Sequence, residues 1–97
     1  MTIGVTDHAV ERYLQRVRGV LDPRPEIAGR VRVAYEAGRV TAADRGTVHV
    51  RDLERPDLVY VCVMDRPRDE LVVVTLWEEG ESALVPRRFT DALRGGR

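Results

Sequence analysis

Residues 58–77, LVYVCVMDRPRDELVVVTLW, contain two apolar runs separated by a turn. The runs from Leu58 to Met64 and from Leu71 to Trp77 are rich in valine and aromatic residues, which favour strands. Residues 66–69 (RPRD) have the composition of a turn, so we expect the two strands to pair as a hairpin at the centre of a sheet. Because neither run alternates with polar residues, both faces should be covered, one by helices and the other by the C-terminal segment or a partner.

Shorter strands are expected on either side of this hairpin. Residues 39–43 predict a short strand, residues 44–46 a turn, and residues 47–51 (TVHVR) a half-buried strand. The period of two in the last segment places its valines inward and Thr47, His49 and Arg51 outward. Beyond the hairpin, we expect an edge strand at residues 82–85 and a short helix that begins at Pro86.

The first forty residues predict two helices. The first spans about residues 7–17, with Thr6 or Asp7 as its N-cap. Its apolar side consists of Ala9, Val10, Tyr13, Leu14 and Val17. The second helix begins after Asp22 with a proline in its first turn and ends before Gly38. This order predicts a single α+β domain over residues 1–97, in which two N-terminal helices pack on a three- to four-stranded antiparallel sheet and a short C-terminal helix follows.

The overall charge gives no general attraction to nucleic acid. The chain of 97 residues has sixteen basic residues, all arginine, and sixteen acidic residues. Any surface that binds nucleic acid must therefore arise from local segregation of charge. The absence of lysine also excludes the usual form of the metal-dependent nucleases that combine an acidic pair with a lysine.

Cys62 is the only cysteine, so neither an intrachain disulfide nor a cysteine-based zinc site is expected. Its apolar neighbours predict that the thiol fills the core rather than acting as a nucleophile. The N-terminus lacks the pattern of a signal peptide, and no apolar run reaches the roughly 20 residues that span a bilayer. We therefore expect a cytoplasmic protein without a membrane partner, a metal ion or a cofactor.

The segment from Thr6 to Arg16 places His8, Arg12 and Arg16 at intervals of four on one side of the first helix. A histidine can exchange a proton near neutral pH, and arginines bind phosphate through paired N–H donors. The alternative is a solvated helix face on which the arginines pair with acidic residues.

His8, Ala9, Arg12 and Arg16 in the first helix, with the threonine-aromatic pattern at Thr75 in the last long strand, match a known pattern. It resembles that of small bacterial and phage domains of unassigned function, and the resemblance covers most of residues 3–77. Those domains are considered similar in fold to the RelE and BrnT ribonuclease toxins. The resemblance therefore implies a RelE-like fold, metal-independent cleavage of RNA and an antitoxin as a protein partner.

Metal-independent cleavage of RNA requires a base for the 2′-hydroxyl, cations for the charged phosphorane and an acid for the leaving oxygen. His8 is the candidate base or acid, Arg12 and Arg16 are the candidate phosphate ligands, and Thr75 is a candidate hydrogen-bond donor. His49, on the outward side of its strand, is a candidate second acid-base group. The competing hypothesis is a noncatalytic protein-interaction module of the same fold, which forms a homodimer through its uncovered sheet or C-terminal segment. The neutral charge favours this second hypothesis.

Overall fold

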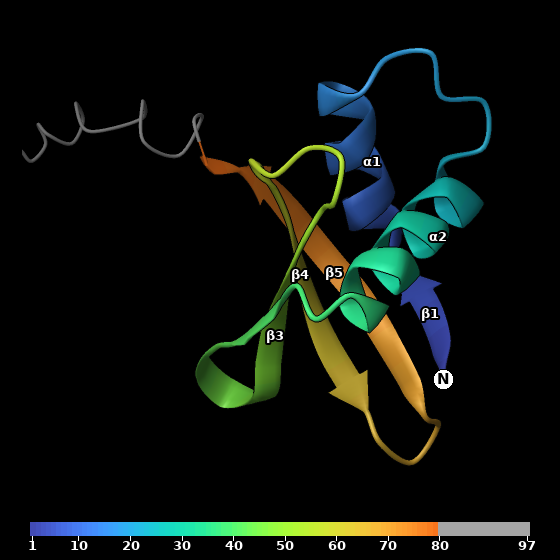
Figure 1. Ribbon diagram of the computed structural model, residues 1–97. Coiled ribbons are helices and arrows are strands. Elements are labelled where there is room, and N and C mark those ends of the chain that lie inside the picture. Colours follow the sequence, from blue (N-terminus) through green and yellow to red (C-terminus); the bar gives the residue numbers. More distant parts are fainter. Residues whose placement is uncertain (80–97) are drawn as a thin grey trace, which may run out of the picture.

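The computed structural model describes residues 1–79 (Figure 1). Its elements are β1 (Thr2–Val5), α1 (Asp7–Arg16), α2 (Pro23–Glu36), β2 (Val40–Ala42), the single 3-10 turn η1 (Asp44–Gly46), β3 (Thr47–Arg51), β4 (Leu58–Asp65) and β5 (Glu70–Glu78). The strands form one sheet with the order β1-β5-β4-β3-β2. The expected hairpin is confirmed as β4 and β5, which pair antiparallel in the interior of the sheet. The expected edge strand at residues 82–85 and the helix from Pro86 lie outside the described residues.

The α+β class is confirmed, but the expected three- to four-stranded antiparallel sheet was wrong. A fifth strand, β1, pairs with β5 in parallel, and its register places Thr2 opposite Glu70 and Val5 opposite Val73. A parallel pair needs a long connection, and here both helices and three strands separate the two partners along the chain. The sheet is therefore mixed, with β1 and β2 at its edges.

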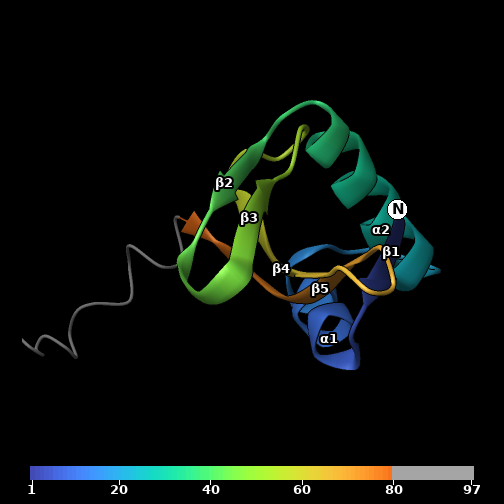
Figure 2. The same cartoon turned by 90° about the horizontal axis from the view of Figure 1, so that it is seen from below.

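Thr6 joins the start of α1 to the sheet. Its hydroxyl oxygen accepts a hydrogen bond from the Ala9 amide at 3.2 Å, which satisfies one of the free donors in the first turn of the helix. The same hydroxyl donates to the Val74 carbonyl at 3.1 Å, and the Thr6 amide donates to the Val73 carbonyl at 3.1 Å. The first turn of α1 is thus fixed beside β5, as Figure 2 also shows.

Both helices pack on the same face of the sheet. One core cluster combines helix residues with alternate residues of the strands: Ala9, Tyr13, Ile27, Val31, Ala34, Val50, Leu58, Tyr60, Cys62, Leu71, Val73 and Leu76. The expected apolar side of α1 is confirmed for the buried Ala9 and Tyr13 and for Val10 and Val17, which pack partly buried against the core, whereas Leu14 is exposed. Cys62 is fully buried as expected, and burial raises the pKa of its thiol to about 12.

The opposite face of the central strands carries a second set of side chains. Residues directly opposite one another in an antiparallel ladder share a face, and successive residues alternate between faces. An irregularity in the ladder between Val61 and Cys62 leaves Val74 without a partner, so Val74 and Thr75 both lie on this face. The set, called the second face below, contains Thr47, His49, Val61, Val63, Val72, Val74, Thr75 and Trp77. Within residues 1–79 no helix covers it, and Val63 is exposed. No helix in this range is long and apolar enough to cross a membrane.

Candidate functional site

Arg12 and Arg16 lie on the side of α1 that faces the end of β5. The Arg12 Nε donates a hydrogen bond to the Leu76 carbonyl at 3.4 Å. The Arg16 Nε lies 3.8 Å from a carboxylate oxygen of Glu78, and its terminal nitrogen donates to the Arg12 carbonyl at 3.2 Å. The Arg16 side chain is only 5% exposed. The arginines of the predicted stripe are therefore held against the sheet, and they do not form a freely solvated helix face.

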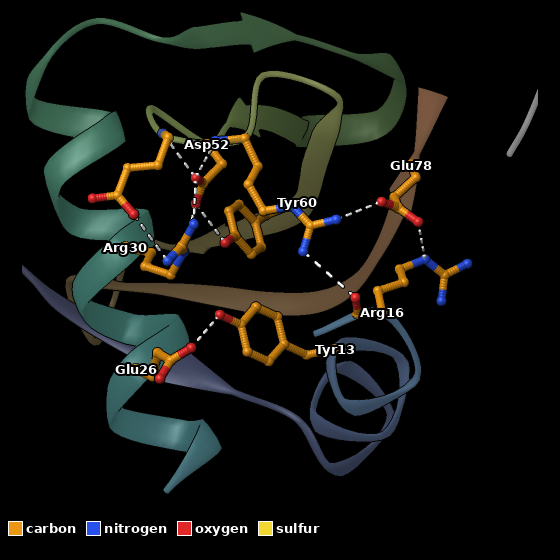
Figure 3. A network of polar contacts seen from close by, with 9 residues as sticks. Tyr13, Arg16, Glu26, Arg30, Asp52, Tyr60 and Glu78 are labelled. Carbon is orange, nitrogen blue, oxygen red and sulfur yellow. Dashed lines mark hydrogen bonds and ion pairs between the residues drawn. The ribbon is translucent and has the colours of Figure 1, made fainter. Parts of the chain in front are cut away.

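A third arginine joins this pair from the turn between β3 and β4. The Arg55 guanidinium donates to the second carboxylate oxygen of Glu78 at 2.7 Å and to the Arg16 carbonyl at 3.5 Å. Figure 3 shows Arg16 and Glu78 facing each other at the end of α1. We call Arg12, Arg16, Arg55 and Glu78 the arginine cluster. It combines three guanidinium groups with one carboxylate, which is a local excess of positive charge in a chain of zero formal net charge.

His8 lies in the first turn of α1, one helical turn before Arg12, and its side chain is exposed. Residues four apart on a helix are surface neighbours, so the imidazole borders the Arg12 side of the helix. The structure thus keeps His8, Arg12 and Arg16 on one side of α1.

Thr75 and His49 lie elsewhere. Thr75 pairs with Val61, while the next residue, Leu76, is buried in the core under the helices. Because side chains alternate along a strand, the Thr75 side chain belongs to the second face and points away from α1. His49 also pairs with Val61, and its ring makes an edge contact with Trp77 at a centroid distance of 6.3 Å. The sheet therefore separates both residues from the stripe on α1.

A buried polar network, which the sequence did not reveal, lies next to the arginine cluster. Asp52 is 1% exposed and follows directly after β3. Its carboxylate accepts hydrogen bonds from Tyr60 Oη at 2.7 Å, from two nitrogens of Arg30 at 2.9 and 2.8 Å, and from the backbone amides of Glu54 at 3.0 Å and Arg55 at 2.9 Å. The network joins α2 to β4 and to the turn between β3 and β4 (Figure 3).

The ionisable groups of this network have hydrogen-bond partners that compensate for their burial. Burial raises the pKa of Asp52, but the hydrogen bonds from Arg30, Tyr60 and the backbone outweigh this effect, and the pKa lies below its usual value. Burial and the bond to Asp52 raise the pKa of Tyr60, so its hydroxyl stays protonated and donates. The network therefore fixes the turn between β3 and β4 and does not transfer protons. Because Arg55 lies in this turn, the network also positions Arg55.

Tyr13 makes a similar contact between the two helices. Its hydroxyl donates to the Glu26 carboxylate, as Figure 3 shows. Burial and this hydrogen bond raise the pKa of Tyr13, so the phenol is neutral at physiological pH. Since Tyr13 lies one residue after Arg12, this contact helps to fix the rotation of α1 that turns its arginines toward β5.

One local signal for the network was present in the sequence. An aspartate at the end of a strand commonly accepts hydrogen bonds from amides two and three residues later, as Asp52 does. Its partner Arg30 is distant in the chain, so its role could not be read from the local pattern.

Among residues 1–79, no three His, Cys, Asp or Glu side chains are grouped so that they could hold a metal ion. No protein-family model, curated protein or solved structure matches the chain. The chemistry of the arginine cluster and its surroundings is therefore the basis for the function proposed next.

Proposed function

We propose that the protein binds RNA at the arginine cluster and cleaves it without a metal ion, as a RelE-like, toxin-type ribonuclease. The observation that carries this proposal is the excess of guanidinium groups around the single carboxylate of Glu78. Arginine is well suited to bind a phosphodiester, because its planar group offers paired N–H donors. Anchoring of Arg12 by the Leu76 carbonyl supports the proposal further, since a fixed cation loses little conformational freedom when it binds.

The exposed His8 supplies the proton-transfer group of this proposal. The RNA 2′-oxygen attacks phosphorus while its proton passes to the imidazole, and the bond from phosphorus to the 5′-oxygen breaks. The products are a 2′,3′-cyclic phosphate and a 5′-hydroxyl end, whose proton comes from water. Arg12 stabilises the charge that develops on the phosphorane oxygens. Arg16, whose side chain is only 5% exposed, contributes its positive charge from behind Arg12 and donates to the Arg12 carbonyl. Thr75 has no part in this reaction, because its side chain belongs to the second face.

The proposal is tested by incubating the purified full-length protein with single-stranded RNA in the presence of a chelator. We expect cleavage by the wild type, a loss of about 100-fold or more in His8→Ala, and a loss in Arg12→Ala. The matched control is Arg68→Ala, because Arg68 is an exposed arginine in the turn that precedes β5, at the opposite end of this strand from Glu78. Equal cleavage by the wild type and His8→Ala, or no cleavage by the wild type, would refute the proposed reaction.

The second face supports a second candidate function, that of a noncatalytic module that forms a homodimer. Val63, Val72 and Val74 line a shallow apolar depression on the second face, with Asp65 and Arg66 at its border. A two-fold interface brings the same patch of both copies together, so Asp65 of one copy can face Arg66 of the other.

Sedimentation of the wild type and of Val63→Arg tests this second candidate. We expect a dimer that the substitution converts to a monomer, because a charged side chain would be buried in the interface. A wild type that stays monomeric at high concentration would contradict it.

A further inference from the structure

A shallow hollow of about 450 Å³ lies between α2 and residues 52–54. Pro25, Gly29, Val33 and Leu53 form its apolar part. Val33 is 54% exposed and Leu53 is also exposed, so two aliphatic side chains border the same opening. The hollow shares no residue with the arginine cluster, and its size falls in the range of pockets that bind ligands or side chains.

Gly29 is an unusual residue at this place. It lies in the interior of α2, where glycine is the least favourable residue after proline. A Cβ atom at Gly29 would meet nothing within 4 Å, and the backbone there does not have the positive φ that favours glycine. The fold therefore does not require glycine at this position. A larger side chain would instead occupy the hollow, and the glycine leaves the helix backbone accessible.

The charges around the hollow are predominantly negative. Among residues 1–79, Glu26, Asp52 and Glu54 line it together with a single cation, Arg30. Arg30 is bound by both carboxylate oxygens of Asp52, so its charge is already matched within the network. It also donates to Glu54 at 3.3 Å, but the Glu54 side chain is largely exposed. The opening is thus apolar and has a negative border.

We propose that this hollow binds a segment of a protein partner that presents an aliphatic side chain flanked by lysine or arginine. The aliphatic group packs on Val33, Leu53 and the backbone of Gly29, where it removes apolar surface from water. The flanking cations lie near Glu26 and Glu54 and give the contact its charge preference. This proposal is independent of the cleavage of RNA, because the hollow and the arginine cluster have no residue in common.

A titration of the isotope-labelled full-length protein tests the chemistry of the partner. Three short peptides share a leucine core that is flanked by lysine, by glutamine or by glutamate. We expect saturable shifts of the amide signals of Gly29 and Leu53, with the lysine peptide binding about tenfold or more tightly than the glutamate peptide. No saturable shift with the lysine peptide, or equal affinity for all three peptides, would overturn the proposal.

Two substitutions show whether binding occurs in the hollow. Gly29→Leu should fill the opening and weaken the lysine peptide about tenfold or more, while thermal unfolding shows that the fold is retained. Leu53→Ser should also weaken binding of the lysine peptide. If Gly29→Leu does not fold, Leu53→Ser alone tests the location. The matched control is Leu21→Ser, because Leu21 is 99% exposed and lies outside the hollow. Unchanged affinity in the two hollow variants would refute this location.

Discussion

Replacing Asp52 with asparagine should strongly destabilise the fold. The Asp52 carboxylate accepts five hydrogen bonds, two of them from the Arg30 guanidinium. An asparagine has one acceptor oxygen, and its amide group would face donors that need an acceptor. Removing one partner of a buried ion pair costs about 3–5 kcal/mol. Because the Arg30 side chain is 23% exposed, water screens part of its charge, and we expect a loss of about 3 kcal/mol.

Urea unfolding followed by the fluorescence of Trp77, the single tryptophan, measures this loss. A domain of this size has a stability of about 5–15 kcal/mol, so the variant should still fold at low temperature. Its melting temperature should fall by about 12–24 °C. Asp57→Asn is the matched control, since Asp57 is exposed in the same connection between β3 and β4. A loss below about 1 kcal/mol in Asp52→Asn would show that the network does not hold the turn.

The pH dependence gives a second measure of the same effect. Because the pKa of Asp52 is lower in the folded state, its contribution to stability is fully present above the unfolded pKa. This contribution is lost as the pH falls through the folded pKa. The difference in stability between the wild type and Asp52→Asn should therefore narrow below about pH 4. A difference that is the same at acidic and neutral pH would mean that ionisation of Asp52 is not its cause.

Three further changes test other parts of the structure. Thr6→Ala should lower the free energy of unfolding by about 1–2 kcal/mol, because it removes the N-cap of α1 and the bond to Val74, and a change near zero in urea unfolding would contradict this role. Cys62, whose pKa is raised to about 12 by burial, should react with iodoacetamide only after unfolding, and rapid labelling of the native protein would contradict its burial. Glu78→Gln should strengthen RNA binding several-fold at low salt, because Arg16 and Arg55 lose the carboxylate between them, and unchanged or weaker binding would argue against the arginine cluster as the binding site.

The central part of the fold could be predicted because its signals are local. Two valine-rich runs on either side of a turn specify the hairpin of β4 and β5. Helix α2 was predicted from Pro23 to residue 37 and ends at Glu36, because a proline and Gly38 bound its apolar pattern. The strand β1 could not be predicted, since four residues next to the N-terminus form it only through pairing with β5, far along the chain.

The candidate site was predicted in part for the same reason. The spacing of His8, Arg12 and Arg16 on α1 follows from the helix period alone. The placement of Thr75 on the other face depends on which strand residues the helices cover, and this is a property of the packed structure. Arg55 and Glu78 belong to the arginine cluster because they form a hydrogen bond with each other. They are 23 residues apart in the sequence, so no local pattern predicts this bond.

Binding of RNA to the arginine cluster is measured most directly by fluorescence anisotropy of a labelled single-stranded RNA. The titration compares the wild type, Arg12→Ala and Arg68→Ala at several salt concentrations. We expect Arg12→Ala to bind about tenfold more weakly, and the number of counterions released on binding should fall by about one, while Arg68→Ala matches the wild type. Equal affinity and equal salt dependence of the wild type and Arg12→Ala would contradict the assignment of α1 as the RNA-binding element.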